Sequence, residues 1–253
     1  MPTIAVINES TGVSDADIRA MLPAFDQQWN RDLAGVWGVE QARFTLLPHA
    51  RLSRTQPPAA GAWWVVFLDD GDQAAALAYR DLTNEGLPLA KVFVGDLLGE
   101  RASVSVGASH EICEMAVDPW LNSAYQDSTG VFWAADVCDP VEDDAYGYEI
   151  AGVLVSDFVT PGWFGRPPGG GALDAAGVTG GRLDLREHAD TPFQILSGGY
   201  AQLFQGRKGW MQVIGHEAMK SPRARTPAKG SRRERRVRQA AEPLKLSKRR
   251  WCP

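Results

Sequence analysis

The sequence has few of the features that mark disulfide-stabilised scaffolds and membrane proteins. Its 253 residues include only three cysteines, too few for a disulfide framework. No apolar run reaches the roughly 20 residues that a membrane-spanning helix needs, and the first residues lack the basic region and cleavage site of a signal peptide. We therefore expect a chain without membrane segments, cytoplasmic by default. Cys113 and Cys138 are expected to form a buried thiol pair, with a disulfide between them as the alternative.

The net charge of −5 conceals two regions of opposite sign. Residues 220–253 hold 13 Lys and Arg against 2 Glu, whereas the rest of the chain holds 13 against 29 acidic residues. The basic tail has few apolar residues and is predicted to be disordered, with nucleic-acid binding as a functional alternative. We predict three parts: a metal-binding domain, a glycine-rich connector with a β-hairpin, and this tail, over residues 1–165, 166–219 and 220–253.

Three residues in the middle of the chain have the spacing of a metal-binding helix. His110 and Glu114 are four residues apart, so on a helix their side chains leave the same face. Imidazole nitrogen and carboxylate oxygen both bind Zn²⁺, and a catalytic zinc site has three protein ligands and a water. Glu111 would take the proton of that water as general base. The pattern is HExxE, a variant of HExxH, and predicts one ion, zinc or another divalent metal.

The residues around this motif favour a helix with an apolar side. Ile112, Met115 and Ala116 supply that side. Pro119 is expected to end the helix, because proline disfavours helical geometry at the residue before it, Asp118. The alternative interpretation is a surface helix that carries one histidine and two solvated glutamates.

Apolar patterning elsewhere predicts an α+β chain. Residues 15–33 have apolar side chains at helical spacing after an N-capping Ser14, and Pro23 is expected to kink this helix. Short β-branched and aromatic runs predict strands at residues 3–8, 42–47, 62–68, 78–81 (an edge strand) and 91–94.

With this order of elements the chain resembles the zincin metallopeptidases over residues 3–164. The resemblance rests on Ser109-His110-Glu111-x-x-Glu114-Met115 before Asp118-Pro119, and on Asp136-Val137-Cys138-Asp139-Pro140 downstream. It looks like an HExxE subgroup whose motif helix ends in Asp-Pro and precedes an acidic, cysteine-containing segment. The resemblance implies a twisted mixed sheet with a backing helix, an edge strand along the cleft and a metal-binding active-site helix. Extended peptides can pair with such an edge.

The third metal ligand does not follow at the short spacing of the third metzincin histidine. Instead an acidic run over residues 136–144 suits ligands from a returning segment, as in gluzincins. Asp136 is the predicted third ligand, because a carboxylate among apolar neighbours needs a partner. Asp139 and Glu142 are alternatives, as ligands or as groups that hydrogen-bond to ligands. The same run could instead form a solvated loop or a calcium site, since calcium takes six to eight oxygens.

Two tyrosines after the acidic run are candidate donors to the oxyanion of a tetrahedral intermediate. Tyr146 and Tyr148 open an alternating stretch that predicts a strand or hairpin. Beyond the connector, apolar runs predict strands, the last two joined by a tight turn, at residues 193–196, 198–205 and 210–214.

These patterns support three functional hypotheses. The leading one is a metal-dependent peptidase, with zinc as the expected ion, that hydrolyses a peptide or protein substrate with Glu111 as general base. The second is a catalytically silent zincin-like binding or structural module, favoured by the missing second histidine. The third is a nucleic-acid-associated protein that acts through residues 220–253.

Overall fold

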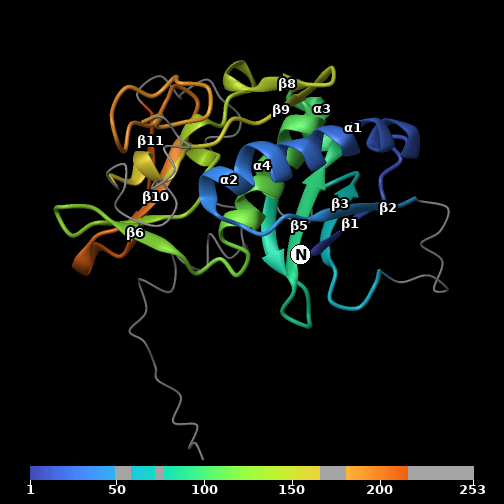
Figure 1. The fold of residues 1–253 in the computed structure, drawn as a ribbon, viewed down its shortest axis with the longest axis horizontal. Coiled ribbons are helices and arrows are strands. Elements are labelled where there is room, and N and C mark those ends of the chain that lie inside the picture. The colour runs from blue at the N-terminus through green and yellow to red at the C-terminus, as the bar shows by residue number, and fades with distance from the viewer. Residues whose placement is uncertain (49–57, 72–76, 166–180, 216–253) are drawn as a thin grey trace, which may run out of the picture.

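A computed structural model of the chain describes residues 1–48, 58–71, 77–165 and 181–215 (Figure 1). The predicted tail, residues 166–180 and 216–219 of the predicted connector part, and His49 lie outside these residues. None of the described helices is both long and apolar enough to cross a membrane.

A five-stranded mixed sheet forms the first half of the fold, in the order β2-β1-β3-β5-β4. Neighbouring strands are parallel except β4, which runs antiparallel to β5 at the edge. The fold class is therefore α+β with a twisted mixed sheet, and the edge position predicted for residues 78–81 is confirmed. The strands are β1 (Thr3–Asn8), β2 (Arg43–Leu47), β3 (Trp63–Leu68), β4 (Ala78–Leu82) and β5 (Pro88–Phe93).

The long helix predicted after β1 is present and continues further than predicted. It begins at a capping box in which Ser14 and Asp17 satisfy each other's backbone N–H groups. It ends where Gly38 adopts a left-handed φ of 65°, which glycine tolerates without strain. Between these caps lie α1 (Asp15–Gln27), the π-helical segment η1 (Gln28–Leu33) and α2 (Ala34–Trp37).

The motif helix lies against the same core as this long helix (Figure 1). It is α4 (Val104–Val117), preceded by the short α3 (Val94–Gly99). The hydroxyl of Ser103 accepts from Val106 N and caps its first turn. The last helical residues precede Asp118 and Pro119, as the sequence predicts. The shared core joins Val65 and Val92 of the sheet to Trp29 and to Ile112 of α4.

A second, antiparallel sheet combines two distant parts of the chain in the order β11-β10-β7-β6. The hairpin predicted near the C-terminal end is confirmed as β10 and β11. Its pairing with β7 was not predicted, because three-residue strands leave little periodicity to read. The members are β6 (Ala124–Gln126), β7 (Phe132–Ala134), β10 (Tyr200–Phe204) and β11 (Trp210–Ile214).

Two further predictions concern the segments between these sheets. The hairpin predicted over residues 146–159 is confirmed by β8 (Tyr148–Ile150) and β9 (Val153–Val155), which pair antiparallel. The strand predicted at residues 193–196 is wrong: the segment has no strand, and Phe193 has a φ of 61°, which extended backbone does not adopt. Cys113 and Cys138 are buried free thiols, as predicted.

Candidate metal centre

The motif helix is buried around its whole circumference, and its polar side chains are buried with it. His110 is 5% exposed, Glu111 3% and Glu114 0%. The alternative interpretation of a surface helix with solvated glutamates is therefore wrong. Buried carboxylates and imidazoles require specific partners, so the contacts of these three residues define the site.

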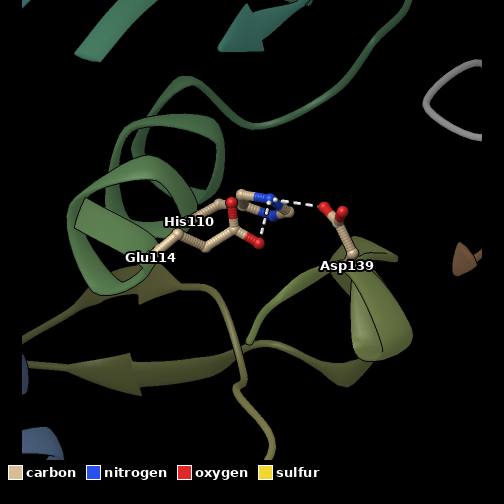
Figure 2. A group of neighbouring side chains, drawn as sticks. All are labelled: His110, Glu114 and Asp139. Carbon is tan, nitrogen blue, oxygen red and sulfur yellow. Dashed lines mark hydrogen bonds and ion pairs between the residues drawn. The ribbon is translucent and has the colours of Figure 1, made fainter. Parts of the chain in front are cut away.

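His110, Glu114 and Asp139 bring three donor atoms together inside the protein (Figure 2). His110 Nε2 lies 3.4 Å from Glu114 Oε1 and 3.1 Å from Asp139 Oδ1. Ligand bonds of 2.0–2.1 Å in a tetrahedral zinc site separate neighbouring donors by about 3.3 Å. The observed separations therefore fit a shared divalent ion. All three residues are 5% exposed or less.

Asp139 lies at the start of a tight turn that contacts β10. It opens the 3-10 turn η3 (Asp139–Val141) directly after Cys138, whose N–H donates to Glu114 Oε1 at 3.3 Å. On the other side, a Cβ at Gly199 would lie 2.5 Å from the Pro140 carbonyl oxygen. Only glycine permits this close approach, so β10 fixes the turn that carries Asp139.

The two carboxylates change the protonation of the histidine. Burial alone would lower the pKa of His110, but the negative charge of Glu114 and the hydrogen bond to Asp139 raise it well above its usual value. The imidazole is therefore protonated at neutral pH when it pairs only with these acids. A metal ion must displace that proton, since only neutral imidazole is a ligand.

Arg80 of the edge strand β4 is the positively charged partner of Glu114, Glu111 and Asp136. Its Nε lies 3.0 Å from Glu114 Oε2 and 3.9 Å from Glu111 Oε2, and its Nη2 binds Asp136 Oδ1. Its Nη1 donates to the carbonyl oxygens of Glu114 at 2.9 Å and Asp118 at 3.0 Å. The guanidinium thus fixes the Glu114 carboxylate, with Oε2 on Arg80 and Oε1 toward His110.

The structure separates the two acids that were considered as third ligand. Asp136, the predicted ligand, binds Arg80 and is outside the His110 donor group. Asp139, considered as an alternative, is inside that group. Glu142 is also buried, at 7% exposure.

The two candidate oxyanion donors each contact a residue outside the His110 donor group. The Tyr148 hydroxyl donates to Asp32 Oδ2 at 2.9 Å, so it is directed toward η1. The Tyr146 ring packs against the His188 ring at a centroid distance of 5.1 Å.

Sequence reasoning missed Arg80 and a second His/Asp group. Asp157, Asp184 and His188 also place three donor atoms within 4.8 Å of one another. Burial raises the pKa of Asp157 to about 9, and the carboxylate of Asp184 adds to the effect. The four-residue spacing of Asp184 and His188 was a signal in the sequence, but no helix is predicted there. For Arg80 no such signal exists, since an arginine in an edge strand usually faces solvent.

A surface pocket of about 380 Å³ also borders β4, but it is distinct from the metal centre. Side chains alternate between the faces of a strand, and Arg80 and the adjacent Asp81 therefore point to opposite sides. Asp81 lines the pocket, and Arg80 contacts α4. The lining residues are Trp64, Asp81, Leu82, Thr83, Asn84, Glu85, Leu89 and Lys91.

Comparison of the chain with protein-family models, with curated proteins and with solved structures found no match. The chemistry of the site is therefore inferred from the donor atoms of His110, Glu114 and Asp139. One imidazole and two carboxylates suit Zn²⁺ and also harder divalent ions, and three ligands leave a fourth position for water or substrate.

Proposed function

We propose that the protein is a divalent-metal-dependent peptidase with a zincin-like fold, and that zinc is its ion. The observation that carries the proposal is that His110 Nε2 lies at tetrahedral-edge distances from Glu114 Oε1 and Asp139 Oδ1, with all three donor atoms within 4.8 Å of one another. The neighbouring Glu111 supplies the acid–base group that hydrolysis needs.

The edge strand supports a peptide as substrate. β4 is the antiparallel edge of the mixed sheet and lies beside α4, to which Arg80 connects it. A peptide in extended conformation can pair with an exposed edge through main-chain hydrogen bonds. The long helix after β1 and the motif helix, which follows β5 and α3, support the proposal of a zincin-like arrangement.

In the proposed mechanism each residue has one role. His110, Glu114 and Asp139 would hold the ion, which would supply Lewis acidity toward a carbonyl oxygen and a water. Glu111 accepts a proton from the attacking water and delivers it to the leaving amine nitrogen, so that peptide and water give a carboxylic acid and an amine. Arg80 keeps Glu114 Oε1 turned toward His110 by holding Oε2.

The second candidate, a silent zincin-like module with a structural ion, is favoured by the burial of the centre. His110 and Glu111 are only 5% and 3% exposed, and Arg80 lies 3.9 Å from Glu111. A centre with so little exposure gives a substrate little access to the ion. The nucleic-acid hypothesis depends on residues 220–253, which lie outside the described residues.

Metal analysis of variants tests the ligand set. We expect His110→Ala and Asp139→Asn each to hold one ion fewer per chain than the wild type, because each loses a donor. Asp136→Asn should keep the ion, since Asp136 binds Arg80. Mass-spectrometric metal counting after dialysis against Zn²⁺ measures this.

The same experiment can exclude each part of the assignment. Equal metal in His110→Ala and wild type would reject the centre. Loss of the ion in Asp136→Asn, with retention in Asp139→Asn, would instead make Asp136 the third ligand, as the sequence predicts.

A further inference from the structure

A second group of side chains that can bind a metal joins the residues after β9 to residues 181–189, which precede β10. Asp157 follows β9 by two residues, and Asp184 and His188 come from residues 181–189. His188 Nδ1 lies 3.3 Å from Asp157 Oδ2 and 3.3 Å from Asp184 Oδ2. Both distances equal the donor spacing of about 3.3 Å expected around one tetrahedral zinc ion.

The surrounding backbone holds the two carboxylates in place. Phe158 N donates to Asp157 Oδ1 at 2.8 Å, which leaves Oδ2 directed at His188. Ala189 N donates to Asp184 Oδ1 at 2.8 Å, and His188 N donates to Asp184 Oδ2 at 2.9 Å. The donor oxygens are therefore positioned by main chain before any ion binds, as a preformed site requires.

The buried carboxylates of this group need a neutralising partner. The side chains of Asp157 and Asp184 are both 0% exposed, and that of His188 is 34% exposed. Two buried carboxylates that face the same point repel each other unless a proton or a cation lies between them, and a divalent cation would replace that proton. The partly exposed imidazole leaves a way in from solvent for an ion and a water.

We infer that Asp157, Asp184 and His188 form a second divalent-metal site, separate from the His110 centre, and that its ion is Zn²⁺. An imidazole nitrogen with two carboxylate oxygens suits zinc, whereas calcium requires six or more oxygens. The Tyr146 ring against the His188 ring restricts the orientation of the imidazole.

The site has a structural role. The two segments already pair through the Val159–Asp184 bridge and through hydrogen bonds from Thr160 N to Leu183 O and from Leu185 N to Phe158 O. Within the described residues, this single bridge is the only β pairing that joins the two segments. An ion held by both adds a cross-link that unfolding must break, so binding stabilises the folded state.

Metal counting with Zn²⁺ alone tests the inference. After dialysis, we expect His188→Ala and Asp184→Asn each to retain one zinc ion fewer per chain than the wild type. Asp190→Asn is the matched control, because Asp190 is a neighbouring exposed acid outside the donor group, and it should retain the wild-type count. Equal counts in His188→Ala, Asp184→Asn and wild type would overturn the inference, with protons then neutralising the two carboxylates.

The melting temperatures of variants with and without Zn²⁺ test this second site independently of the His110 centre. In His110→Ala, added Zn²⁺ should still raise the melting temperature, and in His110→Ala/His188→Ala it should not. A zinc-dependent rise of the same size in both would overturn the second site. Failure of the His110 centre would instead show as equal metal in His110→Ala and wild type, and would leave the His188 comparison intact. If Asp184→Asn does not fold, the partly exposed His188 provides the decisive variant.

Discussion

Replacement of Glu111 by glutamine is expected to lower the rate of peptide hydrolysis by a factor of about 10² to 10⁴, the usual contribution of a positioned acid–base group. The carboxylate of Glu111 is not among the three grouped donors, so the metal content should not change. Glutamine is nearly isosteric and stays polar. The measurement is cleavage of a peptide library, followed by metal counting on the same sample.

Glu114→Gln is the matched control for this result. It removes a charged donor that contacts both His110 and Arg80, so metal content and rate should fall together. A Glu111→Gln variant with full activity would exclude Glu111 as general base. A metal-loaded wild type that cleaves no peptide in the library would favour the silent module with a structural ion.

Replacement of Arg80 by methionine is expected to lower the free energy of unfolding by about 3–5 kcal/mol, the range found when one partner of a buried ion pair is removed. Arg80 is 6% exposed and pairs with Glu114, Asp136 and Glu111. Burial alone would lower the pKa of Arg80, but these acids, Glu114 foremost, raise it above its ordinary value. The guanidinium is therefore always charged. The Arg80→Met variant would leave the carboxylates of Glu114, Asp136 and Glu111 without this positive partner.

Arg182→Met provides a control for the loss of an arginine. Arg182 pairs with Glu187 at 2.7 Å, but the two side chains are 47% and 64% exposed, and such surface pairs contribute about 1 kcal/mol or less. Denaturant unfolding of both variants gives the comparison. Arg80→Lys should lie between wild type and methionine, since it keeps a charge but cannot reproduce the fork in which Nε and Nη2 bind carboxylates while Nη1 binds two carbonyl oxygens. Equal stability of Arg80→Met and Arg182→Met would show that Arg80 is not the required counter-charge.

Local patterns determined the elements around the motif. Ser14 and the apolar spacing after it defined the start of α1, and short apolar runs located the strands of the mixed sheet. The four-residue spacing of His110 and Glu114 placed both side chains on one face of α4, because helical geometry is set by the chain itself. The sequence also located the edge strand and the β10–β11 hairpin.

Contacts between distant residues decided what the sequence could not. Whether α4 lies on the surface or inside depends on which elements cover it, and the structure buries it completely. The choice between Asp136 and Asp139 near His110 depends on Arg80, which lies 56 residues before Asp136 in the chain and binds it. The apolar residues around Asp136 in the sequence indicate that its carboxylate is buried, but they do not indicate which residue it binds.

The sequence by itself therefore determined the α+β class, the motif helix and two of the grouped donors, His110 and Glu114. Only the tertiary structure decided that Asp139 completes the group, that Arg80 neutralises the other acids, and that His188 meets Asp157 and Asp184. The physical reason is the range of the interactions. Backbone geometry and hydrophobic periodicity act over a few residues. The partner of a buried charge can instead come from any part of the chain that the fold brings next to it.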